Sequence, residues 1–276
     1  RLLPVLEAAK EHDRLREMLR KGDRNPKLRP YALRYRMMQA YRNRNWEQAD
    51  THFNKLLATR NERLIAFAKS RRERFELNRR AEALGIAEDD RPKLFWWEEP
   101  YPGNLGDIIN PYIVEKLSGI PPRFAPKGEG MCAIGSVIKF AGPGTPVWGS
   151  GTPRSDDVLT PDADYRAVRG PLTRDLVIQS GGTCPEVYGD AAWFLPILFN
   201  PPVEKTHKTG LILHFMHEDS QPDVGDEIRR IDIRRVGYDQ IEAFLTEMLS
   251  CERIVSTSLH GVIIANATAS PRSGPR

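Results

Sequence analysis

The chain has 276 residues, of which 40% are hydrophobic and 28% are charged, a length that allows one large domain or two of ordinary size. The aromatic content (5 Trp, 10 Phe and 8 Tyr) excludes disorder for most of the chain. No apolar run approaches the roughly 20 residues that a membrane-spanning helix needs. We therefore expect a soluble protein, or one that is at most peripheral to a membrane.

The cysteines are widely separated and odd in number, which argues against a disulfide framework and against a four-ligand metal site. They are Cys132, Cys184 and Cys251. The sequence also lacks Cys-x-x-Cys and His-Glu-x-x-His patterns, so we expect no bound metal and no other cofactor. A reducing compartment, the cytoplasm, is the default expectation, although a chain that starts at Arg1 leaves room for a targeting segment before it.

The net charge of +4 is divided unevenly along the chain. Residues 1–92 contain 23 Lys and Arg against 14 Asp and Glu, a net of +9, whereas residues 93–276 have a net of −5. Anionic lipid headgroups, a nucleic acid or an acidic protein would each match the basic first third. The alternative is a solvated helix face rich in arginine.

Residues 28–80 show helical periodicity with one weak breaker, Pro30, and a turn is expected at residues 43–45. Two helices joined there would resemble a single tetratricopeptide-type hairpin, although no second copy follows at that repeat's period of about 34 residues. A plain helical bundle is the alternative. We place the end of this basic helical region, residues 1–92, at the acidic run before Pro92.

After Pro92 the pattern changes to short apolar runs that end in glycine or polar residues. Residues 93–97 are a predicted strand, residues 103–107 a glycine-rich turn and residues 108–117 a helix, which is the opening of a βαβ unit. Further runs of this kind lie near residues 131–134, 146–148 and 185–188. We predict a first α/β lobe over residues 93–206.

A second series of elements follows residue 206. The predicted strands are residues 210–215 and 253–258, and the predicted helices are residues 238–249 and 260–266. The fold class is therefore α/β, with two Rossmann-like lobes of parallel sheet, a cleft between them, and the second lobe over residues 207–276. Because two strands would leave parallel-sheet edges bare, we expect this lobe to be incomplete, or its last ten residues to be out of frame.

Two turns are candidate ligand sites. Asn104 and Asp107 lie between a predicted strand and a helix, where amide groups and the helix dipole favour an anion and Asp107 could orient a sugar hydroxyl. A simple helix cap is an equal alternative. Gly149, Ser150 and Gly151 end another strand and would let the backbone approach a phosphate or carboxylate, although this pattern is more often an ordinary turn.

Arg169 and His260 are the strongest candidates for chemistry. Arg169 ends a strand before Gly-Pro, so its guanidinium could bind phosphate or carboxylate through paired donors, with an ordinary ion pair as the alternative. His260 follows a strand and opens a helix, a position suited to proton transfer. His214 also lies on a predicted strand, where a histidine is more often a core or supporting residue.

Six short motifs occur in order along the last two-thirds of the chain. They are Gly103-Asn104-Leu105-Gly106-Asp107, Trp148-Gly149-Ser150-Gly151, Val168-Arg169-Gly170-Pro171, Gly189-Asp190-Ala191-Ala192, Leu213-His214-Phe215 and Ser256-Thr257-Ser258-Leu259-His260-Gly261. Each motif is weak alone, but together they resemble the polysaccharide pyruvyltransferase family, with the succinoglycan-type exopolysaccharide enzymes as the nearest branch. The resemblance covers roughly residues 93–267 and not the helical first third.

The resemblance implies a two-lobed fold similar to that of the GT-B glycosyltransferases. It also implies an enzyme that uses phosphoenolpyruvate as donor and places a pyruvate ketal across two hydroxyls of a hexose, with no metal or cofactor. By the same resemblance His260 takes part in donor recognition and proton transfer, and Arg169 holds phosphoenolpyruvate. Ser258 stands where some members have arginine, whose role would here fall to another basic residue. The other expected substrate-binding residues are Asn104, Asp107, Gly149, Ser150, Gly151 and His214.

Three functions remain open. The first is a pyruvyltransferase acting on a saccharide attached to a lipid carrier at the cytoplasmic membrane face, where the basic first third would meet anionic headgroups and no nucleic acid is a partner. The second is a nucleotide-sugar glycosyltransferase of GT-B type, although the chain lacks a carboxylate or lysine pair near the end of the second lobe. The third is a non-catalytic helical interaction protein with a degraded transferase domain.

Overall fold

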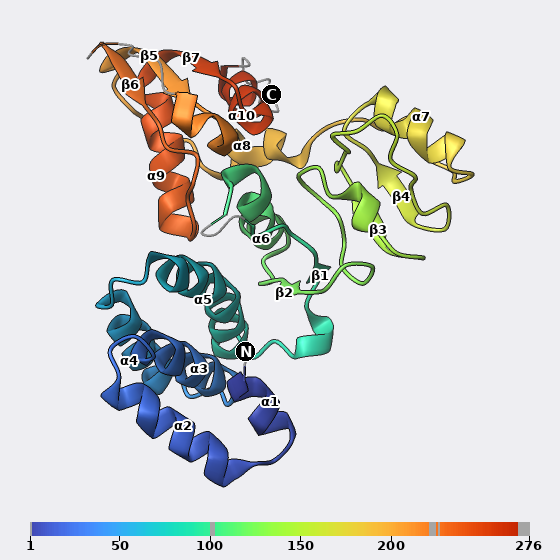
Figure 1. Ribbon diagram of the computed structural model, residues 1–276. Helices are drawn as coiled ribbons and strands as arrows, with labels where there is room; N and C mark the ends of the chain where they lie inside the picture. The colour runs from blue at the N-terminus through green and yellow to red at the C-terminus, as the bar shows by residue number, and fades with distance from the viewer. Residues whose placement is uncertain (1, 100–102, 221–224, 226, 270–276) are drawn as a thin grey trace. The chain divides into compact units, whose positions relative to one another are not determined.

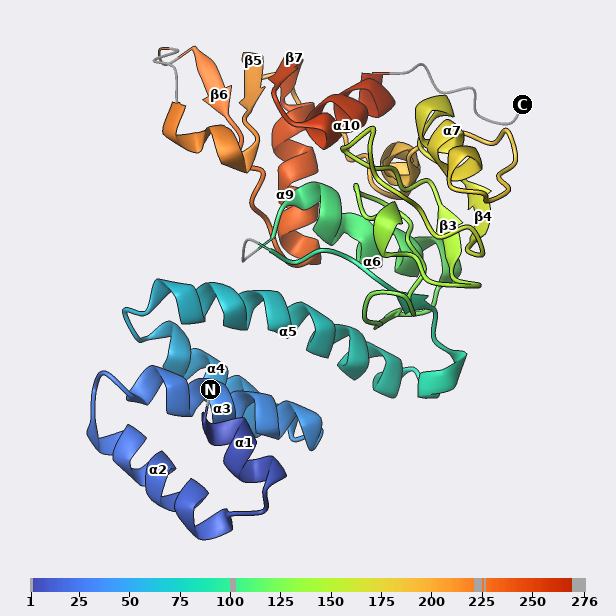
Figure 2. The ribbon, with the colours of Figure 1, turned by 45° about the vertical axis from the view of Figure 1, so that its right-hand side comes forward.

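A computed structural model describes the chain (Figures 1 and 2), and the described residues are 2–99, 103–220, 225 and 227–269. The chain divides into two compact units, residues 1–79 and residues 80–276. The division falls within a helix, and the domain boundaries expected after residues 92 and 206 stay predictions. The expectation that the second lobe is incomplete also stays a prediction, because residues 270–276 lie outside the described part.

The first unit is helical. Its helices are α1 (Leu2–Ala8), α2 (His12–Arg24), α3 (Arg29–Arg42), α4 (Trp46–Leu57) and most of α5 (Glu62–Ala83). The expected turn at residues 43–45 is confirmed, because the side chain of Asn45 accepts a hydrogen bond from the amide of Gln48 at 3.1 Å and so caps α4. α3 and α4 pack side by side (Figure 1) and bury Met37 and Leu56 completely. The likeness to a tetratricopeptide hairpin stays a prediction.

The first part of the second unit is a parallel array of short strands. Its strands are β1 (Lys93–Leu94), β2 (Arg123–Phe124), β3 (Pro146–Trp148) and β4 (Asp164–Ala167). β1 pairs with β2 and β3 pairs with β4, both in parallel. Single parallel bridges, Leu94 to Met131, Cys132 to Val147 and Val168 to Tyr188, join these pairs into one series of neighbouring segments. The mixed α/β class is confirmed in this form.

Helical segments connect and flank this array. They are η1 (Glu88–Asp90), α6 (Leu105–Ser118), η2 (Ile138–Phe140), α7 (Pro171–Gln179), η3 (Ala191–Phe194) and α8 (Leu195–Leu198). α6 follows the glycine-rich turn as predicted, and its residues from Leu105 to Val114 are mostly buried. The helices in the described segments lack the length and apolar character to cross a membrane.

The last part of the second unit is a three-stranded parallel sheet in the order β6–β5–β7. Its strands are β5 (His207–Ile212), β6 (Ile228–Arg230) and β7 (Cys251–Ser256), and its helical segments are η4 (Phe215–Ser220), α9 (Tyr238–Leu249) and α10 (Leu259–Ala269). α9 has the predicted bounds. α9 and α10 both contact β7 (Figure 2), and α10 also packs against α6, η3 and α8.

Two predicted strands are shorter in the structure. The strand expected over residues 93–97 ends at Leu94, because the following aromatic residues pack with other side chains; the ring of Trp97 stacks on Phe140 at 5.3 Å. The strand expected over residues 210–215 ends at Ile212. There the amide of His214 donates to the hydroxyl of Thr257 at 2.9 Å instead of to a strand carbonyl, and η4 begins at the next residue.

Candidate active site

The polar residues of the site follow neighbouring segments of the parallel array at their carboxyl ends. They are Ser136, Ser150, Arg169 and Asp190, which come after residues 131–134, β3, β4 and the bridge at Tyr188. Parallel segments end at the same edge of a sheet, and ligands of α/β proteins bind at that edge. The register of these short strands therefore brings together residues that are up to 54 positions apart in the sequence.

Arg169 is anchored at two of its three guanidinium nitrogens. Its Nε donates to Asp190 Oδ2 at 3.0 Å, and its Nη1 donates to the hydroxyl of Ser136 at 3.2 Å. Its Nη2 is buried and has no hydrogen-bond partner. Because an unsatisfied buried donor costs free energy, this nitrogen is a point at which an anionic ligand would bind favourably.

His260 reaches the same place from the start of α10 and rests on the backbone of α6. A Cβ atom at Gly106 would lie 2.1 Å from Nδ1 of the imidazole, so only glycine at that position admits the ring. Nε2 lies 3.5 Å from Asp190 Oδ2 and is buried without a hydrogen-bond partner. The side chain is 7% exposed.

Asp190 joins the other two residues. Its Oδ2 faces both Arg169 and His260, its Oδ1 accepts a hydrogen bond from the amide of Ala192 at 3.0 Å, and its side chain is only 2% exposed. We call these three residues the Arg169–Asp190–His260 cluster. It combines a cation, an anion and a proton carrier within one buried volume, and leaves one nitrogen of the arginine and one of the histidine unpaired.

Asp107 lies beside the cluster, one residue after the glycine that supports the imidazole. The side-chain Nδ2 of Asn104 donates to Asp107 Oδ2 at 3.2 Å, whereas the side-chain Oδ1 of Asn104 is buried without a partner. A Cβ atom at Gly135 would lie 2.6 Å from Asp107 Oδ1, and the φ of Gly135 is +96°. Glycine is therefore required at position 135 both for space and for backbone conformation.

The two carboxyl groups differ in their acidity. Burial by itself would raise the pKa of Asp190, but the neighbouring His260 and Arg169 together hold it below the ordinary value of 3.8. Burial raises the pKa of Asp107 above that value, since the opposing influence of His260, Asn104 and Arg169 is too weak to cancel it. Environments that separate two carboxyl pKa values in this way are typical of sites that divide acid and charge-stabilising roles.

The turn of residues 149–151, which follows β3, packs against Arg169 of the cluster. The hydroxyl of Ser150 is fully buried and donates to the carbonyl of Gly135 at 2.9 Å. A Cβ atom at Gly151 would lie 2.9 Å from Arg169 Nη1, and one at Gly149 would lie 2.9 Å from the carbonyl oxygen of Gly189. The backbone of this turn does approach other groups closely, as expected, but these groups belong to the protein itself.

A pocket of about 440 Å³ opens beside Asp190. Its lining is rich in aromatic side chains: Trp148 and Phe194 stack at 5.7 Å between ring centroids, and Tyr188 and Trp193 are each 45% exposed. Aromatic faces of this kind suit the apolar faces of a sugar ring.

His214 and Ser258 lie at the carboxyl ends of β5 and β7. The backbone amide of Ser258 donates to the hydroxyl of Ser256 at 3.0 Å, and the residue is 2% exposed. Burial, together with the positive charges of His217 and His260, lowers the pKa of His214. Neither residue has a hydrogen bond to the Arg169–Asp190–His260 cluster among the contacts of the described residues.

The structure thus brings Arg169, His260, Asp107 and Asn104 together from three separate turns, since Asn104 and Asp107 share one. Sequence reasoning missed Asp190 and Ser136 as site residues. Asp190 belongs to one of the six motifs, and its position after an apolar segment was the available signal. Ser136 does not follow a regular strand among the described residues. Its position in the site could be recognised only from the single bridges that residues 131 and 132 form with neighbouring strands.

In the described segments, no group of three or more His, Cys, Asp or Glu side chains is arranged to hold a metal ion. A comparison with protein families finds that residues 138–268 match the family model for polysaccharide pyruvyl transferase. Comparisons with curated proteins and with solved structures give no match. The matched segment contains Ser150, Arg169, Asp190 and His260.

Proposed function

We propose that the protein moves pyruvate from phosphoenolpyruvate onto a hexose of a lipid-linked polysaccharide repeat. The match of residues 138–268 to the polysaccharide pyruvyl transferase family supports a transferase enzyme of this kind. The observation that carries this proposal is the Arg169–Asp190–His260 cluster. It offers an unpaired buried guanidinium nitrogen and an unpaired imidazole nitrogen within the segment that matches the family model.

The donor is a small, highly charged enol phosphate. We assign its phosphate or carboxylate to Nη2 of Arg169, which lacks an acceptor. Asp190 and Ser136 fix the other two nitrogens, so the guanidinium is already oriented before the donor arrives. Such preorganisation reduces the entropy cost of binding.

The reaction needs one proton placed at a defined carbon. A hydroxyl of the hexose adds to C2 of phosphoenolpyruvate while the methylene carbon C3 takes up a proton and becomes a methyl group. A second hydroxyl then displaces phosphate from C2 and closes the ketal. We assign the proton donor to His260, whose Nε2 is unpaired and lies 3.5 Å from Asp190 Oδ2.

Asp107 and Asp190 would have different roles in this scheme. Asp190, whose pKa is lowered, stays ionised and balances the charges of Arg169 and His260. Asp107, whose pKa is raised by burial, is the better candidate to exchange a proton with a hexose hydroxyl. The aromatic pocket beside Asp190 would then hold the acceptor sugar. A cytoplasmic location, peripheral to the membrane, is part of the same proposal.

The experiment measures phosphate release from phosphoenolpyruvate with and without a panel of hexose-terminated oligosaccharides, and identifies the product by mass spectrometry. We expect release that depends on an acceptor, and a product that carries a ketal-linked pyruvate. His260→Gln should reduce the rate by about 10²–10⁴-fold, whereas His12→Gln, in the helical unit, should not change it. Acceptor-independent hydrolysis, or equal rates for wild type and His260→Gln, would contradict the proposal.

A further inference from the structure

A basic pocket lies wholly within the helical first unit. It measures about 540 Å³ and is bordered by the α2–α3 connection, the start of α3, the end of α4 and the α4–α5 loop. The lining residues are Pro26, Lys27, Arg29, Pro30, Tyr31, Lys55, Ala58, Thr59, Arg60 and Asn61. Four of these ten are cations and none is a carboxylate, so the pocket concentrates positive charge.

The cations of the pocket have no close ion-pair partner among the described residues. Lys27, Arg29, Lys55 and Arg60 are exposed, and none of them forms a salt bridge with a carboxylate in the described part of the chain. In the same unit, by contrast, Arg36 is paired with Asp23 at 2.6 Å and Arg79 with Asp50 at 2.8 Å. The pocket therefore gathers four cations that lack the close carboxylate partner that these two arginines have.

The position of these cations relative to the helices is also unfavourable. Lys27 and Arg29 stand at the N-terminus of α3, and Arg60 stands just before the N-terminus of α5, where the positive end of the helix dipole disfavours a cation. Lys55, in the last turn of α4, is the one cation that a helix dipole explains. Helix dipoles do not stabilise the other three cations, whereas a bound anion would.

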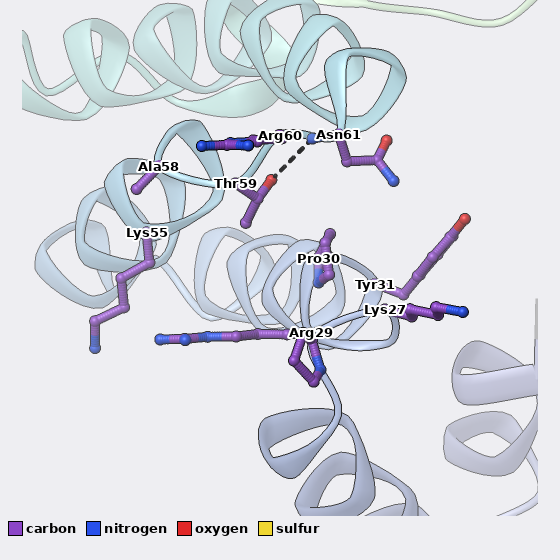
Figure 3. A pocket seen from close by; sticks show the side chains of 10 residues that line it. Lys27, Arg29, Pro30, Tyr31, Lys55, Ala58, Thr59, Arg60 and Asn61 are labelled. Carbon is purple, nitrogen blue, oxygen red and sulfur yellow. Dashed lines mark hydrogen bonds between the residues drawn. The ribbon is translucent and has the colours of Figure 1, made fainter.

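The geometry gathers three of the charged groups. Figure 3 shows the nitrogen-bearing ends of Arg29, Lys55 and Arg60 on one side of Pro30, while Lys27 and Tyr31 extend to the other side. The loop that presents Arg60 is ordered by its own hydrogen bonds: Thr59 Oγ1 donates to the carbonyl of Leu56 at 2.8 Å, and Asn61 Oδ1 accepts from the amide of Leu64 at 3.1 Å. The backbone at Arg60 is thus ordered, and its exposed side chain extends from it.

We propose that this pocket binds a diphosphate-bearing anion through Arg29, Lys55 and Arg60, with Lys27 as an outer contact. A diphosphate has oxygens on two phosphorus atoms, which suit the two guanidinium groups and one ammonium group that line this pocket from three chain segments. The inference concerns residues 1–79 alone, so it stands or fails independently of the proposed transferase activity. The diphosphate could be a free anion or the headgroup of a lipid, which share this chemistry.

The test measures binding of inorganic pyrophosphate to the full chain by isothermal titration calorimetry. The pocket variant replaces Arg29, Lys55 and Arg60 with glutamine. The matched control replaces Lys10, Arg20 and Lys69, three exposed cations of the same unit that lie outside the pocket, so both variants lose the same charge. Circular dichroism verifies that each variant retains the helices of the wild type.

We expect saturable binding by the wild type and by the control, and a dissociation constant at least about tenfold higher for the pocket variant, which corresponds to about 1.4 kcal/mol. Lys27→Gln alone should have a smaller effect. No saturable binding by the wild type, or an equal loss in both variants, would overturn the proposal, because diffuse charge rather than the pocket would then be responsible.

A second arm identifies the source of the anion. The chain is sedimented with vesicles of phosphatidylcholine alone and with vesicles that also contain diacylglycerol pyrophosphate, a lipid with a diphosphate headgroup, with and without free pyrophosphate. Release of vesicle-bound wild type by pyrophosphate supports a headgroup as the occupant. Pyrophosphate binding without vesicle binding supports a free anion. Vesicle binding that pyrophosphate and the pocket variant leave unchanged would contradict a role for the pocket.

Discussion

Two groups of charged residues in this protein differ in how their charge is balanced. The Arg169–Asp190–His260 cluster is buried and pairs its cation with an anion, whereas the pocket around Arg29, Lys55 and Arg60 is exposed and contains no anion. A buried charge needs an internal partner, since its desolvation is costly. An exposed cation does not, because water screens it. Removal of one charge from the buried cluster should therefore destabilise the protein, whereas removal of one cation from the exposed pocket should stabilise it slightly.

The largest expected effect is that of removing the anion from the buried cluster. Asp190→Ala leaves Arg169 and His260 together without a counter-charge, and we expect a loss of about 3–5 kcal/mol in the free energy of unfolding. Urea unfolding followed by tryptophan fluorescence measures it, because four of the five tryptophans lie in residues 80–276.

The matched control is Asp156→Ala, which removes the carboxylate of an exposed pair with Arg154 at 2.6 Å. It should unfold at the urea concentration of the wild type. If both variants unfolded at the same concentration, the pairing inside the cluster would not be what stabilises it.

The second effect tests the contact between the imidazole and α6. Gly106→Ala places a methyl group where the ring of His260 lies, so either the helix or the imidazole must shift, and we expect a loss of about 1–3 kcal/mol. Gly170→Ala is the control, since a Cβ atom there meets nothing within 4 Å; because Gly170 is the N-cap of α7, it should cost no more than about 1 kcal/mol. Equal stability of the two variants would show that His260 does not rest on Gly106.

The third effect concerns pH, and the two carboxyl groups should act in opposite directions. Since the pKa of Asp190 is lower in the folded state than its ordinary 3.8, its contribution to stability is complete above pH 3.8 and is lost as the pH falls through the folded-state pKa. Since the pKa of Asp107 is raised, its contribution is complete below pH 3.8 and is lost as the pH rises through its folded-state pKa.

Urea midpoints measured from about pH 3 to about pH 7 separate the two groups. Below pH 3.8, the stability of Asp190→Asn should depend less on pH than that of the wild type. Above pH 3.8, the stability of Asp107→Asn should fall less with rising pH than that of the wild type, so the variant should be relatively more stable at neutral pH. Parallel profiles for both variants would mean that the two carboxyl groups share one environment.

The smallest expected effect has the opposite sign. Arg29→Gln removes a cation from the N-terminus of α3 and from the neighbourhood of Lys55 and Arg60, so we expect a gain of about 0.3–1 kcal/mol in the absence of ligand. Thermal unfolding followed by circular dichroism measures the gain, which should shrink at high salt. Arg20→Gln, near the middle of α2, is the control and should have no such effect. A loss of stability in Arg29→Gln would show that its charge is already compensated.

Sequence reasoning predicted the elements with clear periodicity and failed where tertiary packing decides. The helix over residues 238–249 and the turn at residues 43–45 were correct, since apolar spacing and an Asn cap define them locally. The strand over residues 93–97 was too long, because aromatic packing at Trp97 replaces strand pairing. Arg169 and His260 could be selected from their positions after strands, but their shared carboxylate, Asp190, depends on register between segments distant in sequence.

The central claim is that the Arg169–Asp190–His260 cluster binds the donor through Arg169. The most direct measurement is calorimetric titration of phosphoenolpyruvate into the wild type, Arg169→Gln and Arg166→Gln, the last of which removes an exposed arginine three residues away that pairs with Asp164. We predict saturable binding by the wild type and by Arg166→Gln, and binding weaker by about tenfold or more in Arg169→Gln. Equal affinity in the two arginine variants would contradict the claim.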